Sequence, residues 1–195
     1  MSTPPVDVPV HATLDALHTM LGDVGGLVDA LTPESWHAAS PCPDLDAARL
    51  VAHLVGGLTA FTGVAQGDVA PDFGEPAIDV AGASRAYRDA GAAVVAAWSA
   101  PGRLAAAFAM PWGETTGAQL VGFLVVEQAV HGWDLARALG RPAAFDATAV
   151  AVADAVARAM VSEGMRVPGM FGPEVEAPAD ADRLDRLAAF LGRRP

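Results

Sequence analysis

The sequence predicts an all-α fold, a four-helix bundle with extra helices at its C-terminal end. Of the 195 residues, 52% are hydrophobic, and alanine supplies much of that share, which favours closely packed helices. Apolar residues recur every three or four positions over several long stretches. No stretch keeps the apolar–polar alternation of a half-buried strand, so helices are expected to form the core.

The N-terminal part of the chain is expected to contribute a tail and two helices. Residues 1–9 carry three prolines and are expected to fray. Apolar spacing predicts a first helix over 10–31, followed by a short turn at 32–36. Prolines on both sides of Cys42 require an extended link, after which Asp44 is a good N-cap for a second helix over 44–66.

The middle of the chain predicts a loop and two further helices. Gly, Pro and Asp are frequent in residues 67–77, which are therefore expected to form a loop. An Ala- and Val-rich third helix is expected over 79–99. The connection 101–115 has room for a short hairpin or an extended strand. One of two adjacent threonines then caps a fourth helix over 115–139, which ends before glycine and proline stop signals.

The C-terminal part is expected to extend the bundle. A fifth helix is predicted over 146–163 and a short one near 180–191, separated by a Gly- and Pro-rich segment. A chain of this length suits one domain. We therefore expect one bundle domain over 1–195, with residues 164–195 as an extension packed on it.

Charge and cysteine content narrow the function classes. Twelve Lys and Arg against 23 Asp and Glu give a net charge of −11, which repels nucleic-acid phosphates and anionic membranes. The single cysteine, Cys42, cannot form an internal disulfide or a cysteine-based zinc site. The N-terminus lacks a signal peptide, and the apolar stretches are too short for a bilayer span. We expect a cytoplasmic protein whose Ala-rich helical faces also suit a homodimer.

Three polar residues in apolar helices are the candidate site. Glu127 and His131 are four residues apart and therefore lie on one face of the fourth helix, one turn from each other. His53 lies in an apolar run of the second helix. Two histidines and a carboxylate facing one another across a bundle form a plausible site for zinc or nickel. A hydrogen-bonded core histidine and a local Glu–His salt bridge are the alternatives.

Three further residues are weaker candidates. Asp134 has the spacing to orient a metal-binding histidine, although a surface salt bridge to a nearby arginine is the favoured interpretation. Arg137 has the charge to meet an anionic substrate, but a role at the helix C-terminus is favoured. His18 would approach the site if the first helix packed on the fourth.

Several motifs of the chain, in this order, resemble one known family. They are Trp36 with Pro41-Cys42-Pro43-Asp44, the run Leu50-Val51-Ala52-His53-Leu54, the block EQAVHGWDLA over 127–136, and the ending Phe171-Gly172-Pro173 with Leu191-Gly192-Arg193-Arg194-Pro195. Together they resemble the mycothiol-dependent maleylpyruvate isomerase N-terminal domain. The resemblance is to a single-domain branch of the DinB-like (YfiT-like) metal-binding helical bundles.

The resemblance implies a ligand set and a thiol partner. In that family a histidine of the second helix and a Glu–His pair on a later helix bind a divalent metal, which here implies His53, Glu127 and His131. It also implies mycothiol as co-substrate. Two departures limit it: Leu45 stands where the family usually has tryptophan, and maleylpyruvate isomerases carry a second domain beyond the point where this sequence ends. Maleylpyruvate itself is therefore not expected as the substrate.

Three functions follow from these observations. The first is a metal-dependent transferase or isomerase that presents a small thiol, mycothiol, to a small-molecule electrophile. The second is a metal-dependent hydrolase, which is less favoured because Glu127 is the only evident general base and is already assigned as a ligand. The third is a non-enzymatic bundle that binds metal for structure or sensing.

Overall fold

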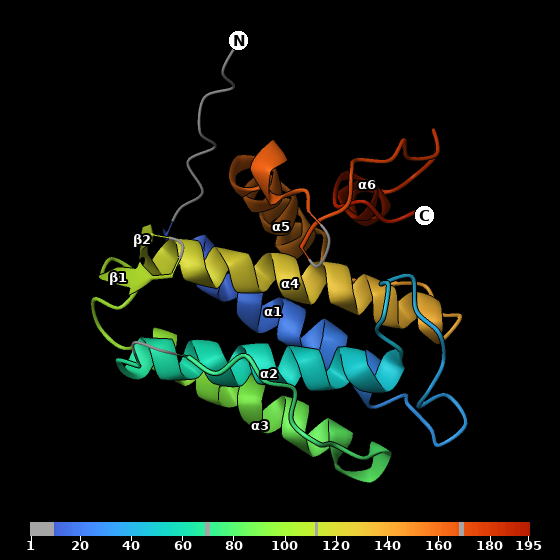
Figure 1. The fold of residues 1–195 in the computed structure, drawn as a ribbon, viewed down its shortest axis with the longest axis horizontal. Helices are drawn as coiled ribbons and strands as arrows, with labels where there is room; N and C mark the ends of the chain where they lie inside the picture. Colours follow the sequence, from blue (N-terminus) through green and yellow to red (C-terminus); the bar gives the residue numbers. More distant parts are fainter. Residues whose placement is uncertain (1–9, 69–70, 112, 168–169) are drawn as a thin grey trace.

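The computed structural model describes residues 10–68, 71–111, 113–167 and 170–195, so the tail expected at 1–9 lies outside the described residues. The described part contains six α-helices, a short 3₁₀ turn and one β-hairpin (Figure 1). The predicted all-α fold with additional C-terminal helices is confirmed. The helices are α1 (Val10–Val28), α2 (Ala47–Gln66), α3 (Val80–Trp98), α4 (Gly117–Ala138), α5 (Ala147–Met160) and α6 (Arg183–Phe190).

The first four helices form the bundle. Each packs on two others, in the cyclic order α1, α4, α2, α3. Helices α5 and α6 pack on each other and on α4, on the side of α4 away from α3 (Figure 1). Helix α4 is therefore the central element, as its nearly continuous apolar sequence predicts, and its residues from Leu124 to Ala136 are buried with the exception of Glu127.

Among the described residues, helix α2 is the one helix that is long and apolar enough to span a membrane by length and composition alone. It has 20 residues and a mean hydropathy of 1.3, but 61% of its most apolar window is buried inside the protein. Its apolar residues face α3 and α4. Burial in the bundle accounts for the apolar composition of α2, since a core helix can be as long and as apolar as a membrane-spanning helix.

The start of α2 corrects one sequence prediction. Asp46, and not Asp44, is the N-cap, because its carboxylate accepts a hydrogen bond from the Arg49 backbone N–H at 2.9 Å. The backbone turns at Pro43 and Asp44 and becomes extended at Asp46, which pairs with Ala39. Asp44 lies in the preceding turn with φ of 67°, a left-handed conformation that aspartate tolerates. The rule for N-caps suits both aspartates, and the pairing with Ala39 decides between them.

The other helix ends follow local sequence signals. Thr116 caps α4 in a capping box with Gln119, in which each side chain bonds to the backbone of the other residue. The connection before it contains an antiparallel hairpin of β1 (Ala107–Met110) and β2 (Gly113–Thr116), which confirms the expected alternative of a hairpin. The first and fifth helices end three residues earlier than the periodicity predicts, at Val28 and Met160.

Candidate metal centre

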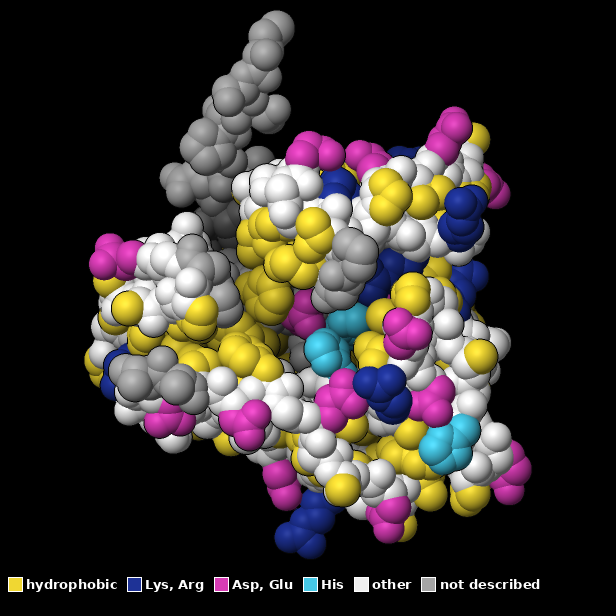
Figure 2. Space-filling model, in the orientation of Figure 1, with side chains coloured by type: hydrophobic (Ala, Val, Ile, Leu, Met, Phe, Trp, Pro, Cys, Tyr) yellow, Lys and Arg dark blue, Asp and Glu magenta, His cyan; other side chains and the backbone are white. Residues whose placement is uncertain are grey.

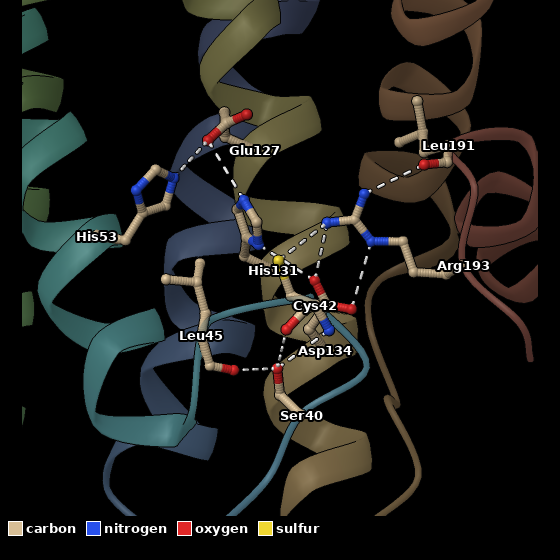
Figure 3. Close-up of polar contacts among 9 residues, drawn as sticks. All are labelled: Ser40, Cys42, Leu45, His53, Glu127, His131, Asp134, Leu191 and Arg193. Atoms are coloured by element: carbon tan, nitrogen blue, oxygen red, sulfur yellow. Dashed lines mark hydrogen bonds and ion pairs between the residues drawn. The ribbon is translucent and has the colours of Figure 1, made fainter. Parts of the chain in front are cut away.

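The three predicted ligands converge between α2 and α4. His53 projects from α2 towards Glu127 and His131 on α4 (Figure 3). The Nε2 atoms of His53 and His131 lie 3.3 and 3.7 Å from the same carboxylate oxygen of Glu127. One candidate ligand atom from each residue lies within 4.8 Å of the other two. Helical spacing puts the α4 pair on one face, and the packing of α2 on α4 brings in His53.

The second ring nitrogen of His131 contacts Asp134. The Asp134 carboxylate is completely buried and accepts a hydrogen bond from Nδ1 at 3.1 Å. The sequence-based prediction of a surface salt bridge for Asp134 is wrong. The C-terminal segment covers this part of α4, where Arg193 contacts Asp134 and water is excluded. Asp134 instead occupies the place of a residue that orients a metal-binding histidine.

Arg193 completes the buried cluster, and sequence reasoning did not assign it a role. Its guanidinium lies 3.0 Å from one oxygen of Asp134 and 3.4 Å from the other, so that the charge of Asp134 is paired (Figure 3). It also contacts the sulfur of the half-buried Cys42 at 3.8 Å and the carbonyl of Leu191 at 3.2 Å. The only signal in the sequence was the position of Asp134 in a nearly continuous apolar helix, since a carboxylate that is buried there requires a positive partner.

Charges in the cluster shift two pKa values. Burial alone would raise the pKa of Glu127, but the hydrogen bond from His53 and the charges of His131, His53 and Arg193 together lower it. Burial alone would lower the pKa of His131. Hydrogen bonds to Asp134 and Cys42, with the charges of Glu127 and Asp134, raise it to about 10. Without a metal these interactions favour the protonated form of His131, because the carboxylates of Glu127 and Asp134 face its two ring nitrogens.

The other two weak candidates lie elsewhere. His18 is exposed on α1 and does not line the cavity described below, so its approach to the site is not observed. Arg137 forms an ion pair with Asp185 at 2.8 Å and lies over the Trp133 ring at 4.8 Å. Arg137 therefore joins α4 to α6 and does not face the candidate ligands.

The three candidate ligands line a cavity of about 1110 Å³. Its walls come from α2 and α4, from the link before α2, and from segments 166–173 and 191–194, with 168–169 outside the description. Figure 2 shows histidine and acidic side chains in a hollow of this face, with hydrophobic side chains along one side. The volume suits a small molecule, and the partly exposed side chains of His53 and Glu127 make these candidate ligands reachable from solvent.

The donor set fits a divalent metal ion. Ligand atoms around tetrahedral zinc lie about 3.3 Å apart, so small side-chain movements would close the observed spacings. Two groups among the described residues have suitable spacing, namely His53–Glu127–His131 and Cys42–His131–Asp134. In the second group Asp134 is already paired with Arg193 and bonded to His131. The first group is therefore the better candidate, with its open side towards the cavity.

Comparisons with known proteins agree with this architecture. Residues 17–136 match the model of the mycothiol maleylpyruvate isomerase N-terminal domain family. Uncharacterized proteins from two strains of Mycobacterium tuberculosis are 33% identical over 155 residues, which cover 79% of this chain and 82% of theirs.

Two solved structures show a similar fold. They are crystal structures of the mycothiol-dependent maleylpyruvate isomerase and of a mutant of it, with 11% and 10% sequence identity and a TM-score of 0.60. The alignment covers 77% of this chain and 70% of theirs. At such low identity the likeness establishes the fold, while the function has to be argued from the site.

Proposed function

The chain belongs to the mycothiol maleylpyruvate isomerase N-terminal domain family and has its DinB-like fold, and from this premise we propose a metal-dependent, thiol-using enzyme. The thiol is mycothiol, and the reaction is an isomerisation or the transfer of the thiol to a small electrophile. The ion, zinc or nickel, is held by His53, Glu127 and His131. The observation that carries the proposal is the convergence of three ligand atoms within 4.8 Å at a solvent-reachable cavity.

A bound divalent ion would supply a Lewis acid that takes up the thiol sulfur and lowers its pKa. The protein's own residues hold and orient this centre. Asp134 fixes the tautomer of His131 by accepting from Nδ1, which leaves Nε2 directed towards Glu127. Arg193 compensates the buried charge of Asp134. This pairing lets a carboxylate persist where water is excluded.

An enzymatic role is preferred to a purely structural ion because of the cavity. Structural zinc sites are usually closed by four protein ligands. Here three residues from two helices form the group, and His53 and Glu127 keep 37% and 20% of their side-chain surface exposed. The cavity gives a thiol and a second substrate room beside them. We place the protein in the cytoplasm, where small thiols stay reduced.

The first test measures metal content. The protein is purified without chelators and analysed by plasma mass spectrometry, alongside His53→Ala and the matched control His18→Ala, an exposed histidine on α1. We expect one zinc or nickel ion per chain in the wild type and the control, and a loss in His53→Ala with unchanged helix content. Equal metal content in the two variants would remove His53 from the ligand set and overturn the proposal.

The second test measures thiol dependence. The metal-loaded protein is mixed with monochlorobimane, a thiol-reactive electrophile, with and without mycothiol, and thioether formation is followed by fluorescence. We expect acceleration only when mycothiol, protein and metal are all present, and a strong reduction in His53→Ala. A rate that does not depend on the protein would contradict thiol transfer to electrophiles of this type.

A further inference from the structure

The cavity lining follows α2 from His53 to Phe61 and α4 from Phe123 to His131, and the candidate ligands lie towards one end of these two stretches. His53, Gly57 and Phe61 are spaced four residues apart on one face of α2, and all three line the cavity. At about 1.5 Å per residue, Phe61 lies roughly 12 Å from His53 along the helix axis. On α4, Phe123 lies one turn before Glu127. The cavity therefore joins a polar end to an aromatic end.

The aromatic end consists of three phenylalanines. The Phe61 ring stacks near Phe123, with centroids 5.8 Å apart and planes at 28°, and meets Phe73 edge-on at 5.6 Å. Phe73 comes from the segment between α2 and α3, so the cluster combines two helices and a loop. Such a cluster offers both ring faces and ring edges to an aromatic ligand.

The rim of the cavity is unusually apolar. Among the residues that the structure describes, the large hydrophobic side chains with high exposure are Phe73 at 45%, Val167 at 44% and Met170 at 52%, and all three line this cavity. Exposed apolar groups gathered at one place mark a binding site more often than single ones do. Their common position indicates that an apolar ligand covers them.

Gly57 leaves open the passage between the two ends. A Cβ atom added there would have no neighbour within 4 Å, so the position faces open space. Glycine in a helix interior weakens the helix, and the packing around Gly57 does not require it. The missing side chain has instead the effect of keeping the polar and aromatic ends connected.

From this arrangement we propose that the cavity binds an electrophile with a neutral aromatic ring. The ring packs on Phe73 and Phe123, and the reactive atom extends past Gly57 to the centre formed by His53, Glu127 and His131. The reaction at that centre rests on the proposed function, whereas binding of the ring needs neither metal nor thiol. The two proposals can therefore fail separately.

The test uses N-phenylnaphthylamine, a neutral aromatic fluorophore, in titrations of the full-length protein. Gly57→Leu fills the passage and Phe73→Ser removes one exposed wall. Gly26→Leu on α1 is the matched control, since that glycine also has no neighbour within 4 Å of an added Cβ and does not line the cavity. We expect saturable binding by the wild type and the control, and at least tenfold weaker binding by Gly57→Leu and Phe73→Ser. Removing metal with a chelator should leave binding unchanged.

Kinetics add a second measurement. Gly57→Leu should raise KM for monochlorobimane, which carries a ring system, by a larger factor than it raises KM for the ringless iodoacetamide. Absence of saturable fluorophore binding, or equal binding by Gly57→Leu and Gly26→Leu, would overturn the proposal. So would self-association that Phe73→Ser abolishes without any fluorophore binding, because a second copy would then cover this rim. If the purified protein contains no metal, or if His53→Ala retains it, while the fluorophore still binds, the proposed function alone is overturned.

Discussion

Asp134 accepts a buried hydrogen bond from Nδ1 of His131, one turn earlier on α4, at 3.1 Å. An ionised carboxylate can only accept, so the proton is on Nδ1 and that nitrogen cannot bind a metal. The other nitrogen, Nε2, is therefore the one that faces Glu127. This single contact determines which atom of His131 is offered to a metal ion, and it makes the proposed metal centre dependent on Asp134, which is not one of the candidate ligands.

The first prediction concerns Asp134→Asn. The substitution keeps the shape but removes the charge, so the guanidinium of Arg193 remains buried without its counterion. We expect zinc affinity, measured by competition with a chelating dye, to fall about 10- to 100-fold. The free energy of unfolding, measured in urea, should fall by about 3 kcal/mol.

Asp154→Asn is the control for this substitution. Asp154 pairs with Arg158 on the outer side of α5, where both side chains retain contact with water. Its replacement should change the free energy of unfolding by less than about 1 kcal/mol. If Asp134→Asn and Asp154→Asn behave alike, the buried ion pair does not support the centre.

The second prediction concerns the coupling of Arg193 to Asp134. Arg193→Met removes the cation and leaves a buried carboxylate, which should lower the free energy of unfolding by about 3 kcal/mol. Arg193→Met combined with Asp134→Asn leaves neither charge, so its loss should be smaller than the sum of the single losses by more than about 1 kcal/mol. A double-mutant cycle in urea measures this difference, with the exposed Arg194→Met as control. Additive losses would show that the two residues act independently.

The sequence predicted those parts of the site that depend on local geometry. Glu127 and His131 lie on one face of α4 because of helical spacing alone. His53 joined them because a polar residue in a buried apolar helix has to face a partner. The predicted N-cap at Asp44 was wrong although the rule was sound, since Asp44 lies in a turn and the backbone pairing of Asp46 with residue 39 delays the start of the helix.

The parts that the sequence did not predict depend on distant contacts. Arg193 reaches Asp134 across 59 positions, and no periodicity relates the two residues. The burial of Asp134 follows from that contact, so its role was also misjudged. The aromatic end of the cavity needs Phe73 from a loop whose path is set by tertiary packing.

The third prediction is a pH dependence of the metal-free protein. The folded state raises the pKa of His131 from 6.5 to about 10. Below pH 6.5 both states carry the proton and the stabilisation is complete. Between pH 6.5 and 10 only the folded state retains it, so the free energy of unfolding should fall as pH rises, by at most about 1.4 kcal/mol per pH unit.

Urea unfolding in the presence of a chelator, at several pH values between 6 and 10, measures this effect. The sequence has no lysine, so no lysine titrates in the window. His131→Gln cannot be protonated and should show a much flatter profile. A wild-type stability that is level or rises over the window would contradict the predicted charge state of His131.

The fourth prediction compares two adjacent glycines of α2. A Cβ atom at Gly56 would lie 2.3 Å from the carbonyl oxygen of Gly74, whereas at Gly57 it would meet nothing within 4 Å. Alanine favours helix over glycine, so Gly57→Ala should raise the free energy of unfolding by about 0.5–1 kcal/mol. Gly56→Ala should lower the free energy of unfolding by about 1–3 kcal/mol, because the loop backbone has to move away.

The loop that contains Gly74 also carries Phe73, so Gly56→Ala should weaken binding of N-phenylnaphthylamine as well. Urea unfolding and fluorophore titration of the two variants provide the measurement, and an equal effect of both substitutions would show that the loop does not pack on α2 at this point.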